Sequence, residues 1–163
     1  MPKFTEAQLE DAIIKLFRAQ GYDYTNGNKL HRKYDDVLLE EDMRDFLSHR
    51  YSNLTDTELE KVINKIKYVP NTPLYMGNRE AFYLVNEGLN LVRDDSALAP
   101  IHIEYIDFGN PENNIFKVVN QYTVQDVRER RPDLILFING LPVAIFELKT
   151  AIQETTNVYD AWR

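Results

Sequence analysis

Apolar residues recur every three or four positions near the start of the chain, which is the spacing of an amphipathic helix. The capping box Thr5-x-x-Gln8 predicts a helix over residues 7–20, and Gly21 ends it. Its buried stripe is predicted to consist of Leu9, Ile13, Leu16 and Phe17. Further helices are predicted over residues 40–50, 55–67 and 79–87, and the polar residues 22–35 are predicted to form a loop or an edge hairpin.

Strand-forming runs dominate the second half and are predicted over residues 89–93, 101–108 and 115–122. Residues 134–138 and 141–146 flank Asn139-Gly140, which predicts a β-hairpin whose strands are apolar on both faces and hence covered on both sides. This order predicts an α+β (mixed α/β) fold with a central, mostly antiparallel sheet, flanking helices and an N-terminal helical insertion. One domain is expected for residues 1–163, helical over 1–88 and with the sheet core over 89–163.

Three charged residues stand at the ends of the predicted hairpin. Asp133 precedes its first strand, and Glu147 and Lys149 follow its second. Because side chains alternate between faces, a strict two-residue loop would place Asp133 opposite Phe146 and put the two acids on opposite faces. A three-residue loop with a bulge shifts this parity by one, so we expect the bulged loop. The spacing alone is also typical of a solvated ion pair across two strands, and it does not decide between the two readings.

The string from Arg131 to Lys149 resembles the N-terminal nuclease domain of the R (restriction) subunit of type I restriction enzymes. Within it, Pro132-Asp133 and Glu147-x-Lys149 resemble the signature of the PD-(D/E)xK nuclease superfamily. The resemblance extends loosely to the beginning of the chain and to residues 106–121. It implies that Asp133 and Glu147 bind Mg²⁺, or Mn²⁺ as a substitute. The backbone carbonyl of Leu148 would be a third ligand, and Lys149 would orient the attacking water.

The resemblance also implies residues outside the hairpin. An acid on the first helix is expected near the metal, with Glu10 the first choice and Glu6 the reserve. Related nucleases carry Gln-x-x-x-Tyr after the lysine, whereas Gln153 is followed four positions later by Asn157. We therefore expect that element beyond residue 163, in a helix that the chain does not complete. Three arginines before the motif are the candidate DNA phosphate contacts: Arg128, Arg130 and Arg131.

The function implied by the resemblance is a Mg²⁺-dependent DNA endonuclease that cuts after ATP-driven translocation. No Gly-rich Lys-Ser/Thr motif occurs, so ATP would act only through motor domains that this sequence lacks. Expected partners are double-stranded DNA and the methyltransferase and specificity subunits of the complex, and the fragment need not be active in isolation. The alternatives are a non-catalytic protein-interaction module on the same fold, or a repair nuclease of the same superfamily.

Composition narrows these expectations only slightly. The chain has no cysteine, which excludes disulfides, thiolate metal sites and thiol nucleophiles. No apolar run approaches membrane-spanning length and no signal sequence begins the chain, so a cytoplasmic location without membrane contact is expected. The net charge of −7 argues against a broad attraction for DNA, so DNA is expected to be delivered by other domains or subunits.

Overall fold

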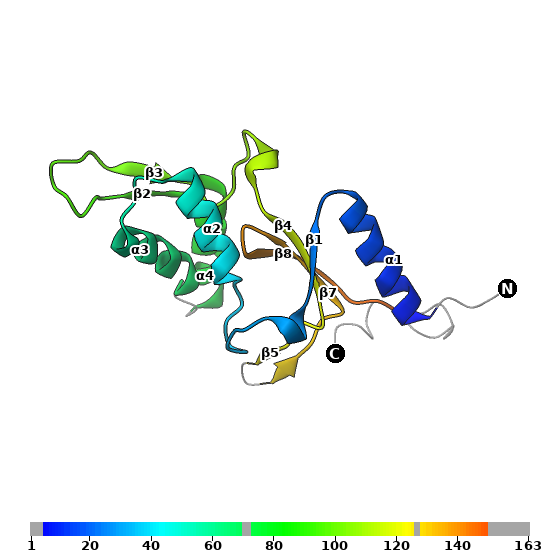
Figure 1. The fold of residues 1–163 in the computed structure, drawn as a ribbon. Coiled ribbons are helices and arrows are strands. Elements are labelled where there is room, and N and C mark those ends of the chain that lie inside the picture. The colour runs from blue at the N-terminus through cyan, green and yellow to red at the C-terminus, as the bar shows by residue number, and fades with distance from the viewer. Residues whose placement is uncertain (1–4, 70–72, 126–127, 150–163) are drawn as a thin grey trace. The chain divides into compact units, whose positions relative to one another are not determined.

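The computed structural model describes residues 5–69, 73–125 and 128–149 (Figure 1). In this part the chain is α+β with four α-helices and a mixed sheet, which confirms the predicted fold class. It forms two compact units. Unit 1 comprises Met1–Val37, Phe116–Ile138 and Pro142–Arg163, and unit 2 comprises Leu38–Ile115 and Asn139–Leu141.

Unit 1 is built on a four-stranded sheet in the order β1-β4-β7-β8. Its strands are β1 (Asp23–Asn26), β4 (Phe116–Asn120), β7 (Leu134–Ile138) and β8 (Leu141–Phe146). Strand β1 runs parallel to β4, and β4 runs antiparallel to β7. A separate two-stranded ribbon consists of β5 (Val124–Gln125) and β6 (Glu129–Arg130), and the 3₁₀ turn η1 covers Gly27–Lys29.

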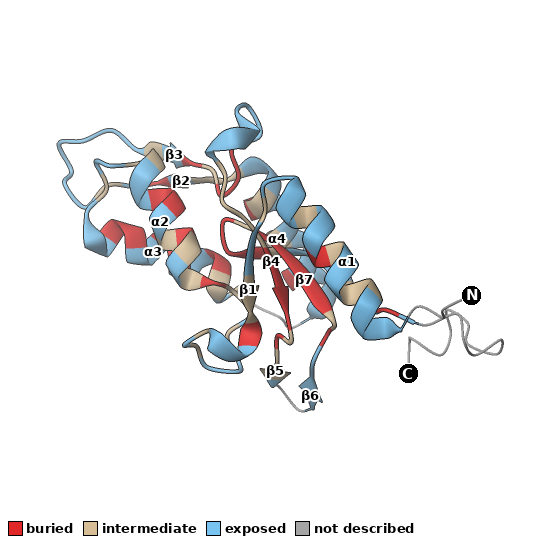
Figure 2. Cartoon of the chain, turned by 45° about the vertical axis from the view of Figure 1, so that its right-hand side comes forward, coloured by how far each residue is buried: buried red, intermediate tan, exposed pale blue. Residues whose placement is uncertain are grey.

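Helix α1 (Glu6–Ala19) covers one face of this sheet. The expected capping box begins it, because Thr5 Oγ1 accepts from the Gln8 N–H at 3.2 Å and Gln8 Oε1 accepts from the Thr5 N–H at 3.0 Å. The fully buried cluster beneath it consists of Ile14, Val118, Leu134, Leu136 and Leu148 (Figure 2). Of the predicted stripe, Leu9, Ile13 and Phe17 pack against this cluster, whereas Leu16 is 55% exposed.

Unit 2 combines helices with a short two-stranded sheet. Its elements are α2 (Glu40–Arg50), α3 (Asp56–Lys67), α4 (Leu74–Glu87), β2 (Leu89–Leu91), β3 (Ile101–Ile103) and the 3₁₀ turn η2 (Pro111–Asn113). A second capping box at Thr55 begins α3. The box closes on Glu58, which is buried and paired with Arg93 at 2.8 Å. No helix in the described part of the chain has both the length and the apolar character needed to span a bilayer.

The predicted helices are confirmed, and the strands are found with different limits. Helix α4 begins five residues earlier than expected, directly after Pro73, because a proline before the first turn lacks only an N–H that the helix does not need. Strand β1 lies where a loop or edge hairpin was expected, and it joins the sheet by pairing with β4, ninety-odd positions later in the chain. The predicted strand 101–108 ends at Ile103, since the residues that follow bond elsewhere: the Tyr105 hydroxyl donates to the Val62 carbonyl and the Asp107 N–H donates to Oδ1 of Asn114.

The predicted three-residue bulged loop is wrong. Only Asn139 and Gly140 separate β7 from β8, and their φ values of 50° and 78° are those of a type I′ turn. The glycine is required, because a Cβ at Gly140 would lie 2.1 Å from the Leu39 carbonyl oxygen. Within unit 2 the Leu39 N–H donates back to the Gly140 carbonyl at 3.0 Å.

The side chains of β8 nevertheless lie on the faces that a bulged loop would give them, one residue out of step with a regular two-residue hairpin. A regular ladder from this loop would put Leu134 and Ile145 on one face. Instead Ala144 and Phe146 pack with Leu134 under α1, and Ile145 is 64% exposed on the other face. The pairing therefore departs from a regular ladder between Leu141 and Ala144. That stretch contains Pro142, a residue that strands accept only at edges and bulges because it cannot donate to the ladder.

The expected division at residue 88 differs from the observed grouping. Helix α1 belongs to the unit that holds the main sheet, and strands β2 and β3 belong with the other helices. Whether the two units act as one domain stays a prediction. The expected closing helix near Asn157, with Gln153, lies outside the described residues.

Candidate functional site

Asp133 and the end of β8 are in direct contact. The Leu148 N–H donates to Oδ2 of Asp133 at 2.6 Å, and the Asp133 side chain is half-buried. This hydrogen bond joins the first acid of the motif to the backbone between its other two members, fifteen positions away in sequence. The structure therefore brings the two halves of the motif together at one edge of the sheet of unit 1.

Glu147 and Lys149 lie on the open face of that edge. Both are exposed, whereas Leu148 between them is buried under α1. The Asp133 side chain is held at this strand end by its hydrogen bond from the Leu148 N–H. That all three charged side chains share one face, as the parity argument expected, stays a prediction.

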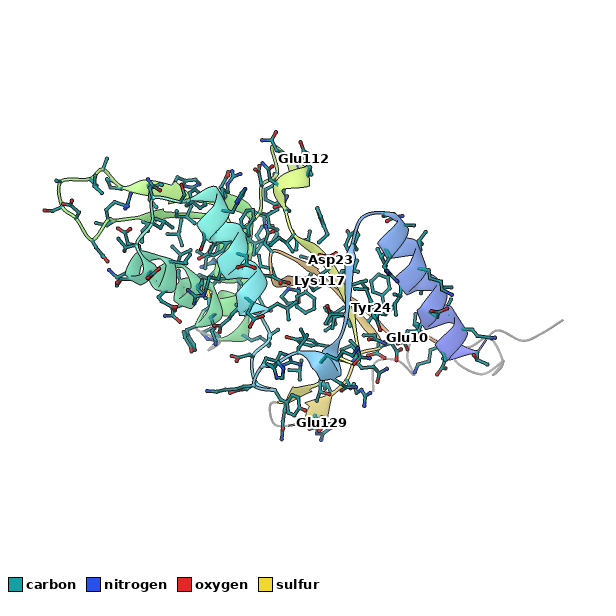
Figure 3. All side chains as sticks on the ribbon, in the orientation of Figure 1. Glu10, Asp23, Tyr24, Glu112, Lys117 and Glu129 are labelled. Atoms are coloured by element: carbon teal, nitrogen blue, oxygen red, sulfur yellow. The ribbon has the colours of Figure 1, made fainter. Side chains whose placement is uncertain are left out.

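Glu10 has a different partner. Its Oε1 accepts from Nδ2 of Asn120 at 2.7 Å, and Oδ1 of Asn120 accepts from the Tyr24 hydroxyl at 3.1 Å. Figure 3 labels Glu10 on α1 and Tyr24 on β1. Asn120 ends β4 and pairs with Leu134, the residue after Asp133. Glu10 therefore lies at the sheet end where Asp133 begins β7, on the α1 side. The sequence analysis did not foresee Asn120 or Tyr24 as its partners.

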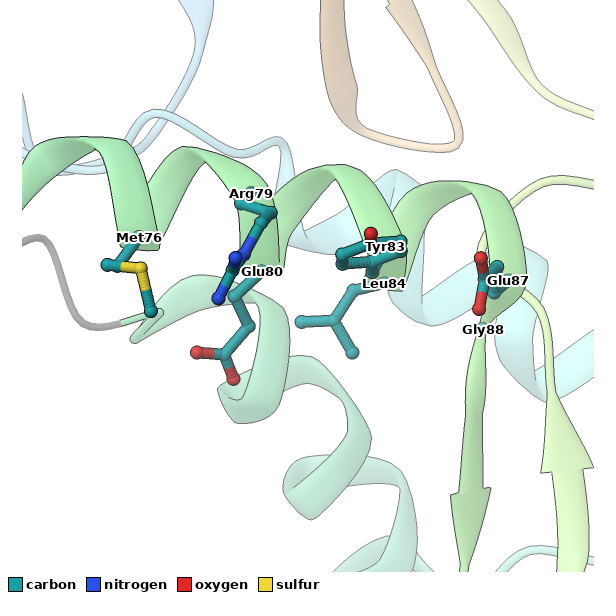
Figure 4. A pocket seen from close by; sticks show the side chains of 7 residues that line it. All are labelled: Met76, Arg79, Glu80, Tyr83, Leu84, Glu87 and Gly88. Atoms are coloured by element: carbon teal, nitrogen blue, oxygen red, sulfur yellow. The ribbon is translucent and has the colours of Figure 1, made fainter.

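No group of three or more Asp, Glu, His or Cys side chains suited to a metal ion occurs within residues 5–69, 73–125 and 128–149. Glu10, Asp133 and Glu147 therefore do not form one three-acid cluster, and a cation at this edge would rely on two carboxylates and backbone oxygen. The pocket in Figure 4 belongs to unit 2 and contains none of the motif residues. Its lining consists of Met76, Arg79, Glu80, Tyr83, Leu84, Glu87 and Gly88.

The three candidate arginines lie just before the motif. Arg130 belongs to β6, where it pairs with Val124, and Arg128, Arg130 and Arg131 are all exposed. Their positions agree with a phosphate-contacting role, which stays a prediction.

The net charge is divided unequally between the two units. Unit 2 contains fourteen acidic and seven basic residues and so accounts for the whole net charge of −7. Unit 1, which carries the motif, contains twelve of each and is neutral. The overall acidity, which argued against DNA binding, is thus a property of the unit that lacks the motif.

Residues 3–163 match the family described as the type I restriction enzyme R protein N terminus. The chain belongs to this family. Membership confirms the resemblance that the hairpin string indicated, and the string supplies the two acids and the lysine that the structure gathers at one sheet edge.

Individual R-subunit relatives cover nearly all of the chain. The chain is 31% identical over 156 residues to a protein of Methanocaldococcus jannaschii that is provisionally named type I restriction enzyme MjaIXP endonuclease subunit, covering 87% of this chain and 15% of that protein. It is 23% identical to the HindI endonuclease subunit of Haemophilus influenzae, over 96% of this chain and 16% of that subunit. It is 26% identical to the SauCOLORF180P endonuclease subunit of Staphylococcus aureus, over 89% and 15% respectively. The chain thus spans about 15% of the length of these relatives.

Proposed function

We propose that this chain is the nuclease domain of a type I restriction enzyme R subunit, with a PD-(D/E)xK site that hydrolyses phosphodiester bonds in double-stranded DNA. The observation that carries the proposal is the hydrogen bond from the Leu148 N–H to Asp133, which unites the motif. Family membership supports this substrate class, because the relatives are named as type I restriction enzyme endonuclease subunits.

The donor atoms at this edge fit Mg²⁺. Carboxylate and carbonyl oxygens are the hard ligands that Mg²⁺ takes, usually one or two carboxylates with water completing the shell. The described hydrogen bond uses Oδ2 of Asp133, so Oδ1 can face a cation. In extended backbone the N–H and C=O of one residue point to the same side of the strand. The Leu148 carbonyl would then point toward Asp133 as its N–H does, and Asp133, Glu147 and this carbonyl would hold the ion.

The residues of the chain would divide the remaining work. Mg²⁺ bound there would act as a Lewis acid on the phosphoryl oxygens. Lys149, whose ammonium has three donors, would orient the attacking water and offset the negative charge that develops on phosphate. Asn120 holds the Glu10 carboxylate at the same sheet end but on the α1 side, so Glu10 would not share a cation with the motif carboxylates.

Calorimetric titration of the chain with Mn²⁺ tests the metal-binding part. Asp133→Asn keeps an acceptor for the Leu148 N–H but removes the charge, so we expect it to abolish the binding heat. Asp11→Asn on α1, where Asp11 forms an exposed ion pair with Lys15, is the matched control and should bind as the unchanged chain does. Equal binding by both variants, or no binding by the unchanged chain at millimolar Mn²⁺, would sink the proposal.

The catalytic part requires the complete enzyme, in which the methyltransferase and specificity subunits would direct the R subunit to DNA in the cytoplasm and the motor would consume ATP. In that assembly Lys149→Ala should stop DNA cleavage while ATP hydrolysis continues, because the lysine belongs to the nuclease edge alone. Retained cleavage would refute its assigned role.

A non-catalytic protein-interaction role is the alternative, and unit 2 supports it. Unit 2 is strongly acidic, and α4 exposes Tyr75 at 73% and Phe82 at 63%, which fits contact with an apolar protein surface that has basic residues around it. If neither the unchanged chain nor the Asp11→Asn control binds Mn²⁺, this interaction role is favoured. The repair-nuclease alternative loses support from the family membership.

A further inference from the structure

We propose that residues 29–34 and the β5–β6 ribbon form one DNA-backbone-binding surface next to the motif, which extends the nuclease function proposed above. The surface comprises five exposed basic residues from two segments about one hundred positions apart: Lys29, Lys33, Arg128, Arg130 and Arg131. The three arginines were already candidate phosphate contacts, whereas residues 22–35 were expected to form a loop or an edge hairpin without a binding role, so the two lysines are new.

Backbone contacts hold the first segment against the ribbon. The Gln125 N–H donates to the Tyr34 carbonyl at 2.8 Å, which adds Tyr34 as a neighbour of β5. Gln125 in turn pairs with Glu129 of β6, labelled in Figure 3. Since neighbouring strands lie about 4.8 Å apart, Tyr34 and β6 are separated by roughly 10 Å. That separation is close to the screening length of about 10 Å at 0.1 M salt, so the two groups of charges act on a ligand together.

The segment is also fixed from beneath. Arg32 stacks with its guanidinium 3.5 Å from the centre of the Tyr122 ring and donates to the Thr123 carbonyl. Tyr122 is fully buried, and its hydroxyl donates to the Val37 carbonyl at 3.1 Å. At the other end of the segment, a Cβ on Gly27 would come within 2.6 Å of the Gln121 carbonyl, so the chain there lies directly on the end of β4. A preformed surface of this kind loses little conformational entropy on binding.

The charge on this surface favours a polyanion. Among the described residues of 29–35 and 124–131, five basic side chains are exposed and only two acids are, Asp35 and Glu129. None of the five is in an ion pair within the described part of the chain, unlike most basic residues of unit 2. Tyr34 is 57% exposed among them and can donate a hydrogen bond to phosphate. Arg131 stands two positions before Asp133, so a backbone bound here continues toward the acids and lysine of the motif.

Duplex DNA is favoured over an acidic protein partner because the same unit holds the phosphodiester-cleaving motif. Each phosphate contact releases counterions, so the logarithm of the binding constant falls with the logarithm of salt concentration by about 0.9 per contact. This dependence gives the surface a measurable signature.

The experiment is fluorescence anisotropy of a labelled 30-base-pair duplex with the chain in EDTA, over a series of salt concentrations. We expect the double variant Lys29→Ala/Lys33→Ala to bind roughly tenfold more weakly at 100 mM salt, with a salt slope lower by about 1.8. Arg128→Ala/Arg130→Ala should act in the same direction. The matched control Lys15→Ala, on α1 at 71% side-chain exposure, should leave affinity and slope unchanged.

The outcomes separate this surface from the catalytic proposal. If the lysine variant binds DNA with the affinity and slope of the unchanged chain, the surface is refuted, whatever the metal titration shows. The same holds if the unchanged chain does not bind the duplex at low salt, or if an acidic protein binds and DNA does not. Mn²⁺ binding should be the same in the lysine variant and the unchanged chain, because neither lysine is among the proposed metal ligands. Melting temperatures within about a degree would show that weaker binding is not a loss of folding.

Discussion

Asn139 makes the stability of the hairpin tip depend on a single side-chain amide. Its side chain is fully buried within unit 2, where Oδ1 accepts from the Ile115 N–H at 2.7 Å and Nδ2 donates to the Tyr105 carbonyl at 2.9 Å and to Oδ1 of Asn114 at 2.8 Å. Three hydrogen bonds at about 1 kcal/mol each give about 3 kcal/mol. The positive φ of 50° adds about 1 kcal/mol for alanine, which tolerates it less well than asparagine. Asn139→Ala should therefore lower the free energy of unfolding by about 4 kcal/mol.

Asn139→Asp is the sharper test, because it keeps the shape and the bond to Ile115. It replaces the donor with a carboxylate oxygen that faces two acceptors, Tyr105 and Asn114, without water. The pKa of the new carboxyl should therefore lie above its value in the unfolded chain, since the charged form is disfavoured. The destabilisation is then fully present above that raised pKa, and it is relieved as the pH falls through the raised pKa toward the unfolded value of about 3.9.

Urea unfolding followed by circular dichroism at several pH values measures both effects. Asn78→Asp, an exposed position on α4, makes the same chemical change without burial and should shift stability by no more than about 0.5 kcal/mol. If Asn139→Ala unfolds within about 1 kcal/mol of the unchanged chain, the reasoning about the buried network fails. It also fails if the loss in free energy of unfolding of Asn139→Asp, relative to the unchanged chain, is as large at pH 3.5 as at pH 7.

Two further predictions concern unit 2. Hydrogen bonds from Arg93 and from the N–H groups of Thr55 and Asp94 lower the pKa of Glu58 to about 2, from 4.5. The stability that this carboxylate provides is present above pH 4.5 and is lost as the pH falls through about 2. Glu58→Gln should therefore make the melting temperature fall less steeply with decreasing pH in the acid range. An unchanged pH dependence there would contradict this assignment. Thr55→Ala removes the cap that accepts from the Glu58 N–H and should cost about 1 kcal/mol in urea unfolding. Thr57→Ala, exposed at the second position of α3, should be near neutral, and equal effects would show that the cap is not the cause.

Local chemistry was readable in the residues themselves. The capping boxes at Thr5 and Thr55 mark the beginnings of α1 and α3, because each is complete within four consecutive residues. The Asn139-Gly140 turn and the acids and lysine on either side of it were likewise identified from the consecutive residues 131–149. Strand β1 was not, because its four residues carry no apolar alternation and become a strand only by pairing with β4.

The sequence by itself determined which segments of the described chain are helices, which residues are candidates for the chemistry, and the family to which the chain belongs. Only the tertiary structure decided which face the motif occupies. The pairing near Pro142 leaves Glu147 and Lys149 exposed while Leu148 packs under α1, and a one-residue slip in a strand has no local signature. Only the tertiary structure likewise shows that the net negative charge belongs to unit 2, and that Lys29 and Lys33 lie in a segment bonded to the β5–β6 ribbon. These depend on contacts between residues about one hundred positions apart, and the free energy of such contacts exists only once the sheet has formed.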